Sequence, residues 1–326
     1  MTGAFLTTLL FSLSVIFANR SIAALGPMRA NLGRLTLAVV VLGIFAHVFG
    51  HGLSSAGLPW FLLSGIIGMG LGDLALYGAL PRLGSRLSLL MTQCLAAPIA
   101  ALAEWLWLDV TLTPAQIAAG IIILAGVALA LTPRKTDLPN NTSDTSLPAA
   151  TRIVPKITWL GLTFGLLSAA GQGLGAVMSR KANLAAQLAG EPTGGLALGI
   201  TAAYQRILAG FVLTAAWFFI QHLLASRILS TIPAGQRART RSENPPRTWR
   251  SYLWIAPNAF SGAILGVSCY QWALATTPSG VVLPIVACTP LVIIPFSYWL
   301  EGERPTVRSL IGAVIAVGGV ISLSQF

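Results

Sequence analysis

The sequence predicts an all-α, polytopic membrane protein with about ten transmembrane helices, arranged as two inverted five-helix repeats. Three observations lead to this prediction. Of the 326 residues, 55% are hydrophobic and 9% are charged, whereas soluble domains carry about 25% charged residues. The hydrophobic residues come in about ten runs of roughly 20, the length that crosses a bilayer as a helix. Landmark residues of the first half also recur in the second half.

The hydrophobic runs lie between charged or Pro/Gly-rich breaks. The first run lacks the basic residues of a cleaved signal peptide, so we expect it to be a retained helix. Residues 133–156 are rich in Pro, Asn, Thr and Ser and predict an exposed linker, which gives a first repeat over 1–132 and a second over 157–326. A second polar segment covers 225–250. The predicted spans are 2–19, 35–53, 59–80, 86–108, 114–132, 157–178, 199–223, 252–274, 279–300 and 307–325.

An internal repeat is indicated by landmarks at a constant displacement. The pair Ala79-Leu80 recurs as Ala273-Leu274, with a length change of two residues. A repeat with an odd number of spans must insert the opposite way round in its second copy, and such inverted pairs are typical of transporters with a site near the bilayer midplane. The other landmarks, each displaced by 192 residues, are Pro98 and Pro290, Gly120 and Gly312, and Gly126 and Gly318.

The second copy, ALATTPSGVVLPIVACTPLVIIPFSYWLEGERPTVRSLIGAVIAVGG, resembles the EamA-type repeat of the drug/metabolite transporter superfamily. It has the Ala-Leu pair, a central proline, a Gly-Glu-Arg turn and a Gly-rich last helix. The first copy is similar but has Thr111 in the place of Glu303. The resemblance implies a ten-helix, gradient-driven carrier in the cell inner (plasma) membrane, without a cofactor, which often exports amino acids, metabolites or toxic compounds.

Candidate binding residues lie at matching places in the two halves. Asp73 lies about seven residues from the end of the third span, roughly 10 Å deep, where a carboxylate is costly unless it faces a cavity, a base or a proton. Tyr77 shares its helix face. An alternative is that Asp73 caps a Gly-rich kink and that the aromatic residues are ordinary packing residues. The predicted substrate-binding residues are Asp73, Tyr77, Gln172, Tyr270, Gln271 and Trp272.

For the other polar residues the sequence mostly predicts structural roles. Glycines around Gln172 are expected to form helix-packing surfaces, while Gln172 itself bonds either substrate or a facing helix. Glu104 stands beside Trp105 and Trp107 and is expected at headgroup level. Four arginines that flank helices are expected to anchor them by reaching toward the interface, with gating as the alternative: Arg20, Arg34, Arg180 and Arg206.

Several functions are disfavoured by the sequence. No P-loop, zincin or nucleophile-elbow pattern occurs, so we predict that the protein is not an enzyme. His47 and His51 lack a third ligand and no metal site is expected. The net charge is +11, and almost all of the Lys and Arg residues lie between the predicted spans. We therefore expect these residues to contact lipid headgroups, not nucleic acid. We expect a small-molecule substrate, proton coupling as one option and no obligatory protein partner. An intramembrane enzyme and a non-transporting scaffold or sensor are the alternatives.

The distribution of basic residues predicts the orientation. Segments after odd-numbered spans hold 17 of the 20 Lys and Arg residues. Because cytoplasmic loops carry the excess of basic residues, both termini are predicted outside the cytoplasm. Many relatives have both termini inside, and here we follow the charges.

Overall fold

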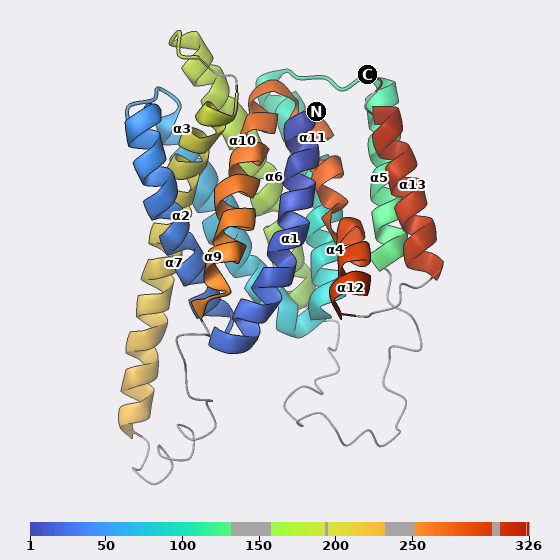
Figure 1. Cartoon of the computed structure of the whole chain (residues 1–326). Helices are drawn as coiled ribbons and strands as arrows, with labels where there is room; N and C mark the ends of the chain where they lie inside the picture. Colours follow the sequence, from blue (N-terminus) through green and yellow to red (C-terminus); the bar gives the residue numbers. More distant parts are fainter. Residues whose placement is uncertain (132–157, 193–194, 232–251, 302–306, 324, 326) are drawn as a thin grey trace.

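The computed structural model describes residues 1–131, 158–192, 195–231, 252–301, 307–323 and 325, and it forms one bundle of helices (Figure 1). The linker 133–156 and most of the polar segment 225–250 lie outside the described residues. The helices of the first half are α1 (Thr2–Leu25), α2 (Pro27–Phe49), α3 (Leu58–Ser64), the π-helix η1 (Gly65–Gly72), α4 (Asp73–Leu108) and α5 (Pro114–Leu131).

The second half repeats this order with more breaks. Its helices are α6 (Trp159–Leu188), α7 (Leu196–Thr231), α9 (Ile255–Asn258), the π-helix η5 (Ala259–Gly266), α10 (Val267–Thr276), α11 (Ser279–Ala287), α12 (Thr289–Glu301) and α13 (Val307–Leu323).

Across the described residues, six helical stretches are long and apolar enough to cross a membrane. Three shorter apolar helices supply the fifth, ninth and tenth spans, and the run from α9 through η5 to α10 supplies the eighth. The predicted all-α fold with ten spans is therefore confirmed. The six long stretches are Thr2–Leu25, Pro27–Phe49, Leu58–Leu80, Leu87–Leu108, Trp159–Leu188 and Leu196–Leu224.

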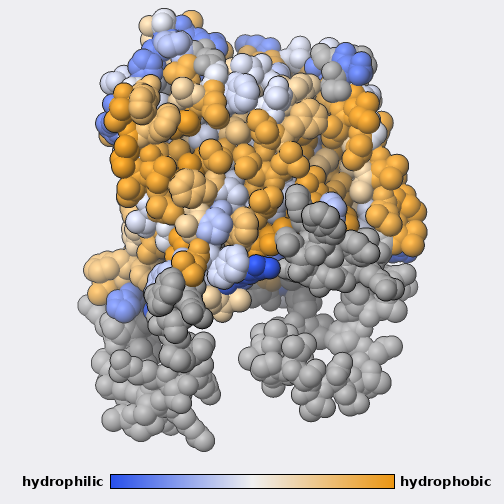
Figure 2. All heavy atoms as spheres, in the orientation of Figure 1, coloured by the Kyte–Doolittle hydropathy of each residue, from blue (hydrophilic) through white to orange (hydrophobic). Residues whose placement is uncertain are grey.

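The packing is that of a protein dissolved in lipid. Alanine, glycine, serine and threonine are common in the interior beside leucine, isoleucine and valine, and many large aliphatic side chains face outward: Ile44, Leu106 and Val314 are 63%, 68% and 73% exposed. Small residues allow helices to approach closely where lipid removes the hydrophobic drive for association. Hydrophobic residues cover the middle of the face shown in Figure 2, with hydrophilic residues toward its ends.

The helix α4 contains the end of the third span and the whole of the fourth. Along α6, Phe164 packs at Gly78 and Gly171 packs at Gly72, so α6 runs antiparallel to the third span. Gly161 instead meets Leu83, and farther along α6 Gly173 meets Ala96 and Ala100, so α6 runs parallel to the fourth span. Hence the chain reverses direction within α4, between these two sets of contacts. The glycines of α6 are packing surfaces, as expected.

The two halves interlock through their π-helices. The segments η1 and η5 are displaced by 194 residues, as is the pair Ala79-Leu80 from Ala273-Leu274. Each π-helix packs mainly against the first two helices of the other half: η1 against α6 and α7, and η5 against α1 and α2. Single-turn π-bulges within α-helices are frequent at functional sites. The interior of the bundle is therefore the contact between the halves.

The remaining pair of equivalent spans, α5 and α13, packs at the edge of the bundle (Figure 1). A Cβ atom placed on Gly126 would lie 2.6 Å from the carbonyl oxygen of Gly312, so two of the repeat landmarks sit at a close helix contact. The start of α1 and the end of α13 lie at the same end of the bundle, called here the terminal end. An even number of spans requires this arrangement.

Candidate functional site

Two arginines from equivalent helices reach the π-helices of the opposite halves. Arg206 of α7 approaches η1, where a Cβ atom on Gly68 would lie 2.7 Å from its Nη2 atom. Arg34 of α2 approaches η5, where a Cβ atom on Gly262 would lie 3.6 Å from its Nη1 atom. Gly68 and Gly262 are themselves displaced by the 194 residues that relate the halves. The absence of a side chain at Gly68 makes room for the guanidinium group.

Arg206 is buried, and this corrects the expectation that it anchors a helix at the interface. The residue is only 3% exposed. Its Cζ atom lies 5.4 Å from the centre of the Tyr270 ring, a cation–π distance. Among the described residues, neither Nε nor Nη1 of Arg206 has a hydrogen-bond partner. A buried cation with unsatisfied donors is costly, and within membranes such residues mark functional sites.

Asp73 begins α4 directly after η1. Its Oδ1 atom accepts a hydrogen bond from Nε2 of Gln172 at 3.2 Å, and the same Nε2 atom donates to the carbonyl oxygen of Gly68 at 3.2 Å. Arg34 and Arg206 both act on Asp73 electrostatically. The prediction left open whether Gln172 bonds a facing helix, and the structure shows that it does. The position equivalent to Asp73 in the second half is Val267.

These residues form one group between the halves, called here the central cluster: Arg34, Asp73, Gln172, Arg206 and Tyr270. The cluster has two positive side chains and one negative side chain. Arg34 is already bonded, since its Nε atom donates to Oδ1 of Asn31 at 2.8 Å. Arg206 is the arginine of the cluster with buried hydrogen-bond donors, Nε and Nη1, that have no partner among the described residues.

The structure brings together only some of the residues predicted from the sequence. Asp73, Gln172 and Tyr270 belong to the central cluster, whereas the side chain of Tyr77 lies outside the described part of the chain. Gln271 is 1% exposed, and both polar atoms of its amide lack a partner among the described residues.

Trp272 packs on α7, where a Cβ atom on Gly199 would lie 3.0 Å from the Trp272 Cβ atom. Sequence reasoning missed Arg206 as a site residue. The available signal was a single arginine inside an otherwise apolar run of about 25 residues.

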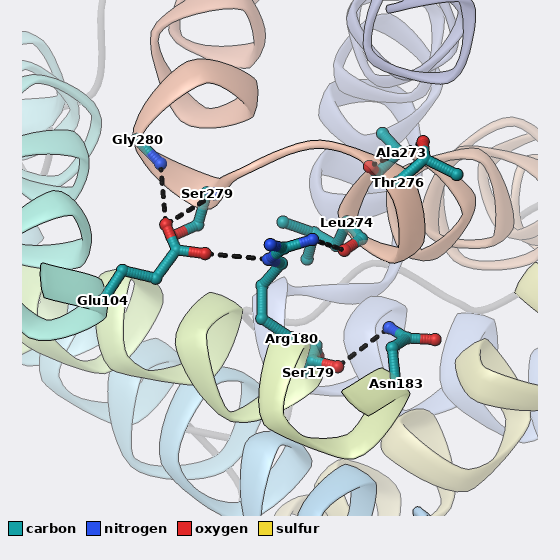
Figure 3. A network of polar contacts seen from close by, with 9 residues as sticks. All are labelled: Glu104, Ser179, Arg180, Asn183, Ala273, Leu274, Thr276, Ser279 and Gly280. Atoms are coloured by element: carbon teal, nitrogen blue, oxygen red, sulfur yellow. Dashed lines mark hydrogen bonds and ion pairs between the residues drawn. The ribbon is translucent and has the colours of Figure 1, made fainter. Parts of the chain in front are cut away.

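A second polar network lies toward the terminal end, around Glu104 (Figure 3). Glu104 was expected at headgroup level, but it is 1% exposed. Its Oε1 atom accepts a hydrogen bond from Nε of Arg180 at 2.8 Å. Its Oε2 atom accepts from the backbone nitrogen of Ser279 at 2.8 Å and from Oγ of Ser279 at 2.6 Å. Arg180 is therefore also not a free interfacial anchor.

This network joins two helix ends across the break in the second half. Glu104 sits at the N-terminus of α11, where a negative charge is favoured, and Arg180 donates to the carbonyl oxygen of Leu274 at 3.1 Å, near the C-terminus of α10, where a positive charge is favoured. The network links α4 of the first half to α6, α10 and α11 of the second (Figure 3). It holds the halves together at one end of the bundle.

A separate apolar pocket of about 490 Å³ lies between α4, α5 and α11. Its lining includes Pro98, Trp105, Gly120 and Pro284, and the neighbouring side chains Leu102 and Ile121 are exposed. This pocket lies beside the Glu104 network, since Gly280 contributes to both. It is distinct from the central cluster.

The interlocked halves, the lipid-facing exterior and the buried polar cluster define a multi-pass membrane protein with a duplicated five-span fold. The chain belongs to the EamA-like transporter family, whose model matches residues 1–132 and 193–325. It is thus a transporter and not an enzyme. The resemblance noted in the sequence is confirmed.

Comparison with individual proteins shows the fold alone. The chain is similar to a solved structure described only as the crystal structure of a protein, with a TM-score of 0.68 and 17% sequence identity over 99% of this chain and 96% of that one. No curated protein matches the chain.

Proposed function

We propose that the protein is a secondary transporter that carries a small solute through the central cluster by alternating access. The observation that supports this most directly is the position of that cluster. It takes residues from both halves, at the point where the π-helix of the first half packs against the second. Relative movement of two inverted repeats opens such a site to each side of the membrane in turn.

In this proposal the Glu104 network is the closed gate at the terminal end. It joins α4 to α11 through one carboxylate, so the two helices separate only if those bonds break together. Gly280 and Ala101 are also in close contact across the same helices, since a Cβ atom on Gly280 would lie 3.0 Å from the Ala101 Cβ atom. Opening at this end would require α11 to move away from α4.

Coupling to a gradient is assigned to Asp73 within the same proposal. It is the acid of the central cluster, and a carboxylate that gains and loses a proton alters the charge next to Arg206. Transport in the outward direction, as an exporter, and residence in the cell inner membrane are part of the proposal.

The test is solute flux in proteoliposomes with a reversible crosslink across the proposed gate. Purified protein should accumulate one class of solutes from a mixed panel without changing them chemically, and protein-free liposomes should not. In the double variant Ala101→Cys/Gly280→Cys, oxidation should stop flux and a reductant should restore it, whereas each single variant should stay insensitive to oxidant. Full flux through the crosslinked protein would show that this end does not open.

Orientation is tested separately. If the basic segments are cytoplasmic, a cysteine introduced into residues 225–250 should resist an impermeant thiol reagent in intact cells and react after permeabilisation. A cysteine at Ser54, in the α2–α3 connection at the terminal end, should react in intact cells. The reverse pattern would place both termini in the cytoplasm.

A further inference from the structure

The unsatisfied donors of Arg206 set a chemical requirement on whatever binds beside them. The guanidinium group lies in the interior of the bundle, 3% exposed, and its Nε and Nη1 atoms have no partner in the described part of the chain. Buried donors are nearly always hydrogen-bonded in native proteins. A ligand with oxygen acceptors would satisfy these groups, whereas a ligand that offers only donors would not.

The net charge of the central cluster also favours a ligand that supplies acceptor oxygens. Two arginines and one aspartate leave one positive charge uncompensated. Arg180, whose side chain is 12% exposed, is already paired with Glu104. A monoanion bound at Arg206 would neutralise the cluster, whereas a bound cation would add a second uncompensated charge in a medium where charge is expensive.

The surroundings of Arg206 are apolar and aromatic on one side. Tyr270 lies against the guanidinium group, and Phe11 lies next to Tyr270 with ring centres 6.5 Å apart. Aromatic side chains beside a guanidinium group favour an organic anion over a small inorganic ion. The anion is therefore an organic one, with an apolar body beside its charged group.

From these observations we infer that the transported solute carries a carboxylate, and that this carboxylate accepts hydrogen bonds from Arg206 in the central cluster. The inference rests on the proposed transport function and adds the substrate class to it. Arg206 is the anion-binding residue. Arg34, its counterpart in the first half, differs from it in two ways: its Nε atom donates to Asn31, and its side chain is half-buried.

The experiment uses the full-length protein in detergent and a series of C2 to C8 monocarboxylates, each with its amide and its amine of the same carbon skeleton. Ligand binding is measured as the rise in melting temperature with concentration. Carboxylates should stabilise the wild-type protein and their amides and amines should not. Equal stabilisation by amides or amines, or no response to any carboxylate, would overturn the inference.

Three variants locate the effect. Arg206→Gln should weaken carboxylate binding by about 100-fold or more, because a charge-assisted contact is lost. Arg206→Lys keeps the charge but loses the planar donor arrangement and should retain part of the affinity. Arg20→Gln is the matched control and should weaken binding by less than about 10-fold, since Arg20 is exposed and its guanidinium group lies against Trp254, outside the central cluster. Carboxylate binding that survives in both Arg206 variants would refute the assignment.

Solute flux measurements test the carboxylate substrate class independently of the proposed transport function. Wild-type proteoliposomes that transport only neutral or cationic solutes would uphold transport and overturn the carboxylate class. A protein that binds carboxylates through Arg206 without moving any of them would uphold the binding site and overturn transport. If Arg206→Gln does not fold, the carboxylate, amide and amine series on the wild-type protein still decides the substrate class.

Discussion

The two halves of the protein share one architecture and differ where the polar residues lie. The first half places Asp73 after its π-helix, and the second places Val267 at the equivalent position. The arginine of α2 is bonded to Asn31, whereas the arginine of α7 keeps unpartnered donors. Both halves turn at the corresponding point of the chain, within α4 in the first half and between α10 and α11 in the second.

The difference in polar residues makes the central cluster asymmetric although the fold is duplicated. The repeat supplies symmetric helix positions, including two arginines that approach opposite π-helices. Acid and free donors then lie on opposite halves, Asp73 on the first and Arg206 on the second, so any movement between the halves changes their separation. Substitutions at Glu104, at Gly171 and at Asp73 measure how much the polar network, the close helix contact and the acid each contribute.

The largest effect on stability is expected at the link between the halves. Glu104→Gln leaves the buried charge of Arg180 unpaired, and it should lower the free energy of unfolding by about 3–5 kcal/mol. The measurement is chemical or thermal unfolding of the purified protein in detergent. Adding Arg180→Met to Glu104→Gln should recover part of the loss, because the unpaired charge is then removed.

Glu191→Gln is the control for this prediction. Glu191 accepts hydrogen bonds from Ser55 and Ala56 in the connections at the terminal end, where the backbone of Ala56 is exposed. Its substitution should cost less than about 1 kcal/mol, as is typical of solvent-accessible polar contacts. If Glu104→Gln were no more harmful than Glu191→Gln, the Glu104 network would not hold the halves together.

An intermediate loss of stability is expected where α6 of the second half packs against η1 of the first half. A Cβ atom on Gly171 would lie 2.7 Å from the Cα atom of Gly72, so Gly171→Ala must push α6 away from η1 at a cost of about 1–3 kcal/mol. Gly318→Ala is the matched control, because nothing lies within 4 Å of its added Cβ atom. Unfolding of both variants should show a loss only for Gly171→Ala, and equal stabilities would contradict the close contact.

A smaller effect on stability than that of Glu104→Gln is expected for Asp73→Asn. The amide keeps the size of the side chain and its bond to Gln172, although Arg34 and Arg206 lose their nearby negative charge. Flux should nevertheless lose its dependence on a pH gradient, because an amide does not exchange a proton at neutral pH. Asp109→Asn is the control. Asp109 is exposed in a left-handed conformation that asparagine tolerates. Normal gradient-driven flux by Asp73→Asn would remove Asp73 from coupling.

The sequence by itself determined the spans, the all-α class and the duplication. A helix in lipid must satisfy its backbone hydrogen bonds internally, so each span appears locally as a run of apolar residues of fixed length. Glycines such as Gly171 were also predictable as packing surfaces, since close helix contact in membranes requires small residues. Asp73, Gln172 and Tyr270 stood out as polar groups in apolar runs.

Only the tertiary structure decided which of these groups meet. Glu104 looks interfacial beside two tryptophans, yet it is buried because α11 and Arg180 cover it. Arg206 looks like an anchor, yet α7 packs against η1 and Tyr270, which keeps its guanidinium group inside the bundle. These partners are 64 to 175 residues apart in the chain. Local periodicity fixes how each helix turns, but the packing of helices from both halves fixes which polar side chains face one another.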